Sequence, residues 1–444
     1  MAKKFTNSDI LRMVEENDVR FIRLQFTDVF GILKNVAIIS RQLPKILEEG
    51  CMFDGSSIDG FVRIEESDML LLPDTDTFEI FPWRPQQGKV ARLICDVHTT
   101  DGNPYEGCPR YVLKKALGEA EKMGYTMNVG PECEFFLFHT DADGKPTTIT
   151  QDEGGYFDLA PIDKGEDARR DICLTLEEMG FEIEASHHEV AQGQHEIDFK
   201  YMDALATADS IMTFKYVVKS IAARHGLYAT FMPKPIYGIN GSGMHMNQSL
   251  STKDGNAFYD KNGELGLSSV AYNYIAGVME HIKSIVAVTN PIVNSYKRLV
   301  PGYEAPCYIA WSAKNRSPLI RIPASRGAGT RIEVRSPDPA ANPYLAIALM
   351  LASGLDGLKR NLTPPPPVNK NIFKLTAEEM KKYGVSSLPG SLYDALQTFK
   401  ADPLVKETLG DHVFEMYYEF KIKEWDSYRT AVHPWEINEY LTKY

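Results

Sequence analysis

The sequence lacks the features that mark membrane proteins, nucleic-acid binders and proteins attached to membranes by basic patches. Its longest apolar run, residues 344–355, is about a dozen residues long, whereas a membrane-spanning helix needs ~20. Acidic residues outnumber basic ones by 60 to 48, so the chain carries a net charge of -12. General nucleic-acid binding and polybasic membrane attachment are excluded, because both depend on an excess of lysine and arginine.

Cysteine pairs and a targeting signal are also missing. The six cysteines are scattered without a C-x-x-C pair, which is typical of free thiols in a reducing compartment. Two lysines near the start are followed by Phe5-Thr6-Asn7-Ser8-Asp9, where a signal peptide would have an apolar segment. We therefore expect a soluble, cytoplasmic protein. Neither a Walker P-loop nor a dinucleotide-binding glycine fingerprint occurs in the sequence.

The first part of the chain, residues 1–104, predicts a small α+β domain. Short β-rich runs alternate there with turns, and one amphipathic helix opens the segment. The predicted elements are a helix over 9–16 capped by Asn7 or Ser8, a hairpin of strands 20–26 and 33–39, and a strand over 89–97.

The remaining residues, 105–444, predict a larger domain in which helices and strands mix. Its strands follow one another in hairpin-like succession, which favours a mainly antiparallel sheet flanked by helices. The predicted helices run from Pro109 to Gly124, over 171–179 and over 204–225, and the predicted strands are 129–138, 182–190, 195–199, 229–232, 244–250 and 332–335.

The C-terminal segment is rich in aromatic residues. Residues 414–444 contain nine of them, whereas aromatics make up 11% of the whole chain. Two interpretations stay open: a helix that packs on the protein's own core, or an arm that contacts another subunit, because aromatic residues are enriched at interfaces.

Acidic side chains recur at strand spacing in two places. Glu132 and Glu134 lie two residues apart in an apolar strand, so they share a face on which two carboxylates repel unless a cation or a proton lies between them. The alternative is a sheet edge that faces water. Glu182 and Glu184 share one face of a second strand.

A hairpin after that second strand would bring Glu189 and Glu196 close together across a glycine-containing turn. Three histidines, His187, His188 and His195, flank these glutamates. We interpret His187 and His188 as residues of a strand surface, because neighbouring residues point to opposite faces and cannot both bind one metal ion.

A glycine-rich turn at 240–245 enters a strand with His245, Asn247 and Ser249 on one face. Glycine lets a ligand approach the backbone closely, although this signal is weak by itself. A cationic stretch follows, in which Arg331 and Arg335 share a strand face with an acid. Its members are Arg298, Arg316, Arg321, Arg326, Arg331 and Arg335, with Glu333 among them.

Arginine binds phosphate and carboxylate groups in a bidentate manner, although surface salt bridging is the alternative for such a stretch. Glutamate oxygens with one imidazole favour Mg²⁺ or Mn²⁺ over zinc. The residues alone therefore indicate a metal-dependent enzyme that handles phosphate and a carboxylate substrate.

The same motifs resemble type I glutamine synthetase, in order and over nearly the whole chain. The matching segments are 52–57, 130–136, 240–245, 297–306, 315–317, 331–335 and 338–344. The resemblance implies a β-grasp N-terminal domain, a larger catalytic domain and a dodecamer of two stacked hexameric rings. It also implies active sites between subunits, with the Asp54 loop of one subunit closing on the next, and an aromatic C-terminal arm, about 414–444, that grips the opposite ring.

The resemblance implies ATP-dependent ligation of ammonia to glutamate through γ-glutamyl phosphate, as part of nitrogen assimilation. Asp54, Glu304 and Arg316 match catalytic residues: Asp54 takes a proton from ammonium, and the Glu304 loop closes over the site. Two or more Mg²⁺ or Mn²⁺ ions are implied, one held by Glu134, Glu189 and Glu196, another by Glu132, His245 and Glu333.

The resemblance also assigns the substrates. The glutamate site is implied to comprise Asn240, Gly241, Arg298, Glu304, Arg316 and Arg335. The ammonium site is implied to comprise Asp54, Tyr156 and Glu189. The ATP site is implied to comprise Glu184, Asn247, Ser249, Arg316 and Arg321.

The subtype is implied by one departure and one match. Phe373 stands where adenylylated members of the family carry a tyrosine, so the chain resembles the shorter, non-adenylylated subtype that glutamine inhibits. Arg63 matches the arginine tied to that inhibition, and nitrogen-responsive transcription regulators are implied as partners. Two alternatives stay open: a ligase that joins a polyamine to glutamate, and a non-catalytic scaffold.

Overall fold

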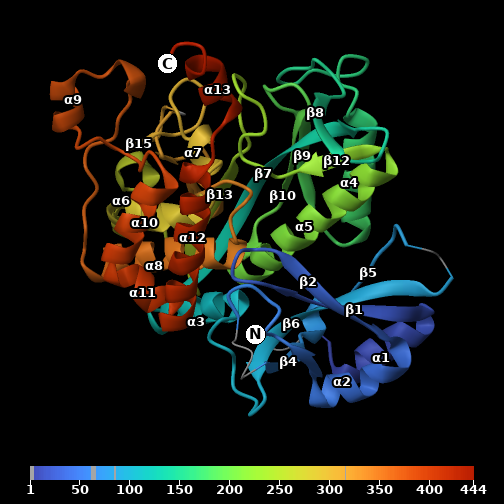
Figure 1. Cartoon of the computed structure of the whole chain (residues 1–444). Coiled ribbons are helices and arrows are strands. Elements are labelled where there is room, and N and C mark those ends of the chain that lie inside the picture. Colours follow the sequence, from blue (N-terminus) through green and yellow to red (C-terminus); the bar gives the residue numbers. More distant parts are fainter. Residues whose placement is uncertain (1–4, 62–66, 85–86, 316) are drawn as a thin grey trace.

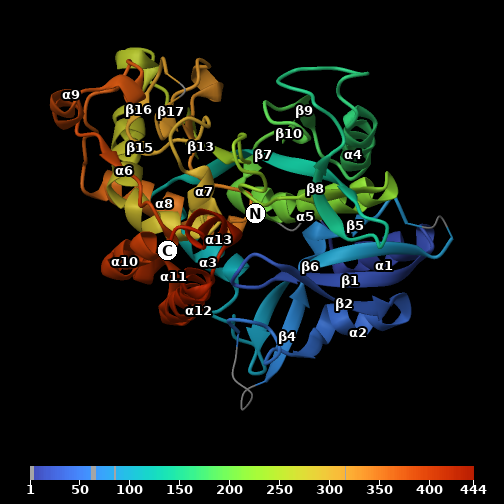
Figure 2. The ribbon, with the colours of Figure 1, turned by 45° about the horizontal axis from the view of Figure 1, so that its top comes forward.

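The computed structural model describes residues 5–61, 67–84, 87–315 and 317–444 (Figure 1). The N-terminal domain, drawn in blue, lies beside a larger domain that contains a second sheet and a group of helices. In both orientations α5 (Ala204–Arg224) lies between the two sheets (Figures 1 and 2). The predicted α+β class is therefore seen in both parts of the chain.

The N-terminal sheet has the strand order β2-β1-β6-β4-β3, with β5 paired to β6. The predicted hairpin is present, because β1 and β2 pair antiparallel, while β1 and β6 pair in parallel. The elements are α1 (Asn7–Glu16), β1 (Val19–Thr27), β2 (Leu33–Ile39), α2 (Leu43–Glu49), β3 (Cys51–Asp54), β4 (Asp68–Pro73), β5 (Glu79–Ile80) and β6 (Lys89–Thr99).

The first helix begins two residues earlier than the sequence predicted. Its cap is Thr6, whose hydroxyl accepts from the backbone N–H of Asp9, while the Asp9 carboxylate accepts from the backbone N–H of Thr6. The predicted caps Asn7 and Ser8 are wrong, because this reciprocal pair satisfies two free N–H groups where a single cap satisfies one.

The larger sheet has the order β16-β17-β18-β13-β7-β10-β9, and the long central strand β7 also pairs with β8, β11 and β12. Among the described strands of this sheet, only β16 and β17 pair in parallel, so the predicted mainly antiparallel sheet is correct. Its strands are β7 (Thr126–Thr140), β8 (Pro146–Thr150), β9 (Ile183–His188), β10 (Gln194–Phe199), β11 (Met202–Asp203), β12 (Leu227–Thr230), β13 (Met244–Thr252), β14 (Gly255–Asn256), β16 (Trp311–Ser312), β17 (Ile320–Arg321) and β18 (Ile332–Val334).

Helices cover this sheet and form the rest of the core. The long apolar run of the sequence is α8, which is buried nearly all round and packs against α6. Gly277 allows the close approach, because a Cβ there would lie 2.1 Å from the carbonyl oxygen of Ser353. The helices are α3 (Pro109–Lys122), α4 (Glu166–Glu178), α6 (Ser269–Thr289), α7 (Ser295–Arg298), α8 (Pro343–Lys359), α9 (Ala377–Lys382), α10 (Leu392–Ala401), α11 (Pro403–Leu409), α12 (Asp411–Thr430) and α13 (Pro434–Tyr440), and β15 (Tyr308–Ile309) pairs with β19 (Ser386–Ser387).

A buried ion network joins the two domains. The Arg110 guanidinium in α3 contacts Asp74 (2.8 Å) and Asp96 (2.9 Å) of the N-terminal domain and Asp209 of α5 (2.9 Å). Removing Arg110 would leave three carboxylates without their shared partner, which is far more costly than losing an exposed ion pair. The network therefore fixes the position of the N-terminal sheet relative to α5.

The aromatic C-terminal segment divides into a packed part and an exposed part. In α12, Phe414 stacks on Phe399 with ring centroids 4.9 Å apart, and the buried Tyr417 hydroxyl donates to the carbonyl oxygen of Ala287. Beyond α12, Trp435 is 63% exposed and Tyr444 is 99% exposed. The first open interpretation, packing on the protein's own core, thus holds for α12 only.

Among the described residues, no helix combines the length and the apolar character needed to cross a bilayer.

Candidate active site

A cavity of about 330 Å³ is lined by residues of β7, β9, β10, β13 and β18 and of the loops at 240–241 and 303–305. Sequence reasoning placed most of its polar lining in one site. The predicted residues that line it are Glu132, Glu134, Tyr156, Glu189, Glu196, Asn240, Gly241, His245, Arg298, Glu304, Arg321, Glu333 and Arg335.

Strand register explains why the acids converge. Glu134 of β7 lies opposite Glu196 of β10, and Glu132 lies between Asp198 of β10 and His245 of β13. Side chains alternate along a strand, so Glu132 and Glu134 face the cavity while Cys133 is fully buried on the other face. The predicted shared face is therefore real, and the alternative of a solvent-facing sheet edge is wrong.

One group of possible metal ligands is Glu132, His245 and Glu333, which offer ligand atoms within 4.8 Å of one another. His245 Nδ1 lies 3.1 Å from Glu132 Oε2, and Asn247 Nδ2 donates to Glu132 Oε1 at 2.9 Å. Burial alone raises the pKa of Glu132, but the hydrogen bonds from His245 and Asn247 outweigh it and lower that pKa to about 2. Glu132 is therefore an anion ready to bind a cation.

Glu333 belongs to this group but also contacts two arginines. Arg321 Nη1 donates to Glu333 Oε2 at 2.7 Å, and Arg335 Nε donates to Glu333 Oε1 at 2.9 Å. These contacts bring the cationic stretch of the sequence to the acids, so the interpretation of Arg321 and Arg335 as surface salt bridges is wrong. Each Glu333 oxygen accepts one of these hydrogen bonds and has a second lone pair with which it could bind a metal ion.

The second group, Glu134, Glu189 and Glu196, is the one that the family resemblance implies, and all three residues line the cavity. The ligand atoms found within 4.8 Å of one another on this side are those of His187, Glu196 and Asp198. Gln194 Nε2 and the backbone N–H of Gly243 both donate to Glu134 Oε2 at 2.8 Å. Burial and the charge of Glu189 still raise the pKa of Glu134 to about 7. Burial and the charges of Glu134 and Asp198 likewise hold the pKa of Glu196 well above its usual value.

Burial and mutual repulsion both disfavour the ionisation of these carboxylates together unless positive charge is added. Oxygen donors that repel one another in this way fit a hard divalent cation, which lets every carboxylate ionise. The donor set of both groups therefore suits Mg²⁺ or Mn²⁺.

Three residues of the cavity were missed or misread in the sequence. Asp198 shares a strand face with Glu196, and alternation could have identified it; burial and the nearby Glu132 raise its pKa to about 7. Gln194 carried no recognisable signal. His187 lines the cavity 3.7 Å from both Glu189 and Glu196, and His188 is fully buried, so their interpretation as strand-surface residues is wrong.

The opposite wall of the cavity carries a fixed arginine and a strained loop. Arg298 is buried, and its Nη1 donates to the carbonyl oxygen of Ser336 at 2.6 Å. Asn240 Nδ2 donates to Glu304 Oε2 at 3.1 Å. Glu304 has a φ of 58°, a left-handed conformation that is uncommon for a non-glycine residue and clusters at functional sites.

A second cavity, of about 360 Å³, shares Glu132 and Asp198 with the first. It brings together three residues predicted to bind ATP, namely Glu184, Asn247 and Ser249. Arg321, which was also predicted to bind ATP, lines the first cavity. The two cavities thus meet at Glu132, where phosphate groups of a nucleotide in the second would reach the metal ligands of the first.

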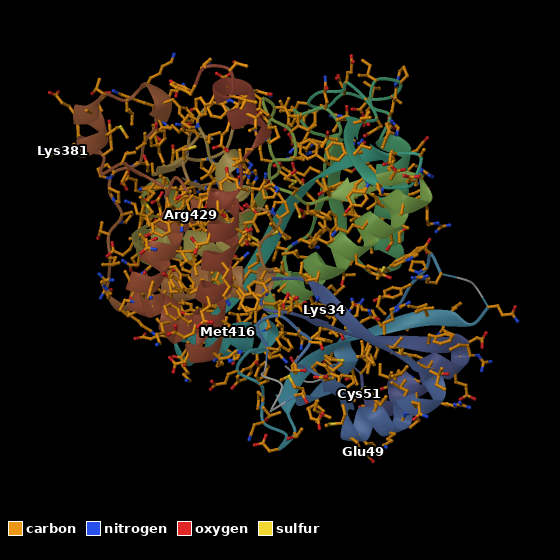
Figure 3. All side chains as sticks on the ribbon, viewed as in Figure 1. Lys34, Glu49, Cys51, Lys381, Met416 and Arg429 are labelled. Atoms are coloured by element: carbon orange, nitrogen blue, oxygen red, sulfur yellow. The ribbon has the colours of Figure 1, made fainter. Side chains whose placement is uncertain are left out.

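Among the predicted residues that the structure describes, Asp54 is not brought to the cavity. Asp54 ends β3, the strand of the N-terminal domain that begins at Cys51 (Cys51 is labelled in Figure 3), and does not line either cavity. Its carboxylate accepts hydrogen bonds from the backbone N–H and the hydroxyl of Ser56, which lower its pKa. Arg63 and Arg316 lie outside the described residues.

Comparison with protein families identifies both domains. Residues 106–440 match the family model described as glutamine synthetase, catalytic domain, and residues 18–100 match the one described as glutamine synthetase, beta-Grasp domain. The chain belongs to the glutamine synthetase family. The resemblance seen in the sequence and the predicted β-grasp fold class are thereby confirmed, and membership of this family makes the chain a ligase.

Individual relatives cover essentially the whole chain. The glutamine synthetase of Clostridium saccharobutylicum is 66% identical over 441 residues, which are 99% of this chain and 100% of the relative. That of Staphylococcus aureus strain MRSA252 is 59% identical over 443 residues, which are 100% of this chain and 99% of the relative.

Two solved structures share the fold of this chain. A GmaS–ADP complex aligns with a TM-score of 0.89 at 34% identity and covers 98% of this chain and 99% of that one. A cryo-EM structure of Plasmodium falciparum glutamine synthetase aligns with a TM-score of 0.88 at 26% identity and covers 99% of both chains.

Proposed function

We propose that this member of the glutamine synthetase family converts ATP, L-glutamate and ammonia into ADP, phosphate and L-glutamine through γ-glutamyl phosphate. The observation that carries the proposal is the convergence of two groups of metal-ligand residues with Arg298, Arg321 and Arg335 in one cavity. Phosphoryl transfer requires carboxylates that bind cations and arginines that bind anions in the same site.

The metal ligands follow from the two groups described above. Glu134, Glu189 and Glu196 would hold one divalent cation, and Glu132, His245 and Glu333 would hold another. Mg²⁺ or Mn²⁺ bound there supplies positive charge against the phosphates of ATP. The assignment of either ion is part of the proposal, and the donor atoms suit both.

The first step transfers the γ-phosphoryl group of ATP to the side-chain carboxylate of glutamate. The glutamate is held by Arg298, Arg335, Asn240, Gly241 and Glu304. The backbone itself requires glycine at position 241, because a Cβ there would lie 2.2 Å from the carbonyl oxygen of Pro233. Arg321 and Arg316 steady the transferring group by charge.

The second step replaces the phosphate by ammonia. Ammonium binds beside Tyr156 and Glu189, Asp54 of a neighbouring subunit takes its proton, and ammonia attacks the acyl phosphate. The strained Glu304 loop closes over the cavity, because water in the site would hydrolyse the acyl phosphate.

A product assay tests the proposal directly. Purified protein is incubated with ATP, glutamate and Mg²⁺ or Mn²⁺, first with ammonium and then with putrescine, and both phosphate and the amide product are measured. Phosphate release and glutamine formation that depend on ammonium support the proposal. Turnover with putrescine alone would identify a γ-glutamyl-amine ligase, and no turnover with either amine would identify a non-catalytic scaffold.

We infer further that the chain assembles into two stacked hexameric rings in the cytoplasm and that the end of the chain joins the rings. The support is the apolar surface beyond α12, where Val432, Trp435 and Leu441 are 70%, 63% and 71% exposed. In an isolated subunit this apolar surface would be exposed to water, which is unfavourable in free energy. Contact with a second subunit would bury it.

Truncation after Ala431 is expected to separate the rings and leave each subunit folded, because the residues that it removes, 432–444, are exposed or only partly buried. Size-exclusion chromatography with light scattering would then show hexamers or smaller species. A deletion that begins at Phe414 is unsuitable, because it removes buried core of α12. A dodecamer that survives the shorter truncation contradicts the role of this arm.

The regulatory part of the proposal rests on Arg63 and on the family resemblance alone. If glutamine inhibits the enzyme by binding in the glutamate site, Arg63→Ala is expected to keep the activity and to raise the inhibitory concentration of glutamine. Inhibition of this kind requires that glutamine bind one conformational state of the enzyme more tightly than another by ~1–3 kcal/mol. This difference corresponds to a ratio of affinities of roughly 5- to 150-fold. Overlapping inhibition curves for the two proteins would exclude Arg63 from feedback. A role in nitrogen assimilation and contacts with nitrogen-responsive transcription regulators belong to the same proposal.

A further inference from the structure

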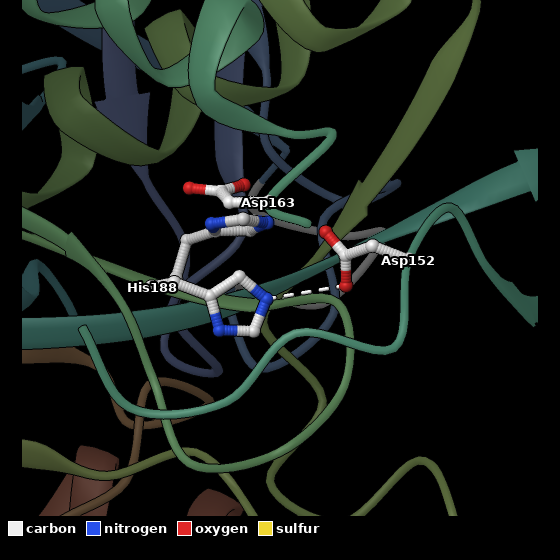
Figure 4. Close-up of side chains that lie close together, drawn as sticks. Asp152, Asp163 and His188 are labelled. Atoms are coloured by element: carbon white, nitrogen blue, oxygen red, sulfur yellow. Dashed lines mark hydrogen bonds and ion pairs between the residues drawn. The ribbon is translucent and has the colours of Figure 1, made fainter. Parts of the chain in front are cut away.

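A buried polar cluster lies directly behind the first cavity, and the catalytic scheme does not use it. Its members are Asp152, Asp163, Arg169, His188 and His195; the structure buries all five, and Figure 4 labels Asp152, Asp163 and His188. Four of these side chains could in principle hold a metal ion. The Arg169 guanidinium already supplies a positive charge there, because its Nη1 donates to Asp163 Oδ2 at 2.7 Å.

Asp152 ties three separate pieces of backbone to one carboxylate. Its Oδ1 accepts from the backbone N–H of Gly193 (3.0 Å), in the turn between β9 and β10, and from that of Gly154 (3.3 Å). Its Oδ2 accepts from the backbone N–H of Lys164 (3.2 Å). The same carboxylate therefore holds both ends of the segment 152–164 against the β9–β10 turn.

His188 connects this anchor to the cavity. Its Nε2 donates to Asp152 Oδ1 at 3.2 Å (Figure 4), and its Nδ1 donates to the carbonyl oxygen of Glu189 at 2.6 Å. The carbonyl oxygen of His188 accepts from the backbone N–H of Phe157 at 3.1 Å. Phe157 directly follows Tyr156. His188 therefore forms hydrogen bonds beside both residues of the proposed ammonium site, Tyr156 and Glu189.

We propose that Asp152 and His188 are positioning residues that hold Tyr156 and Glu189 at a fixed separation and thereby set the affinity for ammonium. This inference rests on the proposed function, because it takes Tyr156 and Glu189 as ammonium ligands. Neither Asp152 nor His188 lines the cavity, so both act through the residues they hold.

Ammonium depends more on this separation than the other substrates do. It is a small cation with only N–H donors, so its binding energy comes from a few acceptors at hydrogen-bond distance. Glutamate is held from the opposite wall by Arg298, and ATP by residues of β13 such as Asn247. Tyr156, the proposed ligand within the 152–164 segment, serves ammonium alone, so a shift of this segment would weaken ammonium binding selectively.

The test compares Asp152→Asn with a matched control, Asp402→Asn. Asp402 also contacts a largely buried histidine, since its Oδ2 lies 2.7 Å from His281 Nδ1, and it also accepts from a backbone N–H two residues on, that of Leu404. It lies between α10 and α11 and does not line the cavity. The control thus loses the same kind of charge without disturbing the 152–164 segment.

Kinetics with each substrate varied in turn give the main result. Asp152→Asn is expected to raise the KM for ammonium at least about tenfold, while the KM values for ATP and glutamate change by less than about twofold. Asp402→Asn is expected to leave all three KM values near those of the wild type. His188→Asn, which loses the bond to Asp152, is expected to repeat the ammonium-specific effect.

A measurement without turnover separates this inference from the proposed function. Hydrogen exchange of the backbone amides in 152–164 and at Gly193 is expected to be faster in Asp152→Asn than in the wild type and in Asp402→Asn. If the wild type fails to make glutamine from ammonium, the proposed function is wrong whatever the exchange result. The positioning role is wrong if the wild type is active and the variants Asp152→Asn and His188→Asn either raise all three KM values together or raise none of them.

Discussion

Replacing Glu132 with alanine is expected to lower glutamine formation about a thousandfold or more while the oligomer keeps its size. Charge stabilisation by a bound cation is worth several kcal/mol, and each ~1.4 kcal/mol is a factor of ten in rate. Glu132 lies where the two cavities meet and accepts hydrogen bonds from His245 and Asn247. Its loss removes a ligand and leaves the apolar core untouched.

Glu182→Ala is the matched control for this variant. Glu182 precedes β9, is exposed, and pairs with Lys200 at 2.8 Å instead of facing a cavity. Its substitution is expected to leave turnover unchanged, because exposed ion pairs contribute little. Steady-state turnover with light scattering on both variants checks this, and near-normal turnover of Glu132→Ala would remove Glu132 from the metal site.

Mixing two inactive variants is expected to restore activity. Asp54 does not line the cavity of its own chain, so the proposed site takes Asp54 from one subunit and Glu132 from its neighbour. Asp54→Ala and Glu132→Ala should each be inactive as pure oligomers. When both chains are present in equal amounts within one ring, random placement pairs an intact Asp54 with an intact Glu132 in about a quarter of the sites.

Co-expression with two different affinity tags, followed by purification over both, yields the mixed oligomers for this test. Turnover near a quarter of the wild-type value per site is the expected result. Mixing the two purified variants without subunit exchange is the control and should stay inactive. Mixed oligomers with no more activity than either parent would show that Asp54 acts within its own chain or not at all.

Local patterns predicted the secondary structure well because they depend on neighbours along the chain. Alternation identified the faces of β7 and β13, and the glycine and proline signals placed α3 and α5 within a few residues. The cap of α1 was misplaced by one or two residues, because the reciprocal bonds between Thr6 and Asp9 outweigh the preference for Asn7 or Ser8.

The candidate site was found only in part for the same reason. Glu132 and Glu134 were found by their spacing, but the roles assigned to residues far apart in the chain came from the family resemblance. Asp198 could have been identified by its alternation with Glu196, but its pairing with Glu132, 66 residues away along the chain, depends on a register that no local pattern fixes. Tertiary packing likewise decided that His187 lines the cavity and that His188 is buried.

By itself the sequence determined the strands, the helices and the residue types that can bind cations and anions, because propensity and alternation act over a few residues. The tertiary structure alone decided which of these residues meet. It joined the acids of β7, β10 and β18 in one cavity, packed α12 on the core while leaving Trp435 exposed, and kept Asp54 away from its own cavity. Those outcomes depend on register and packing between distant segments, which the free energy of the whole fold selects.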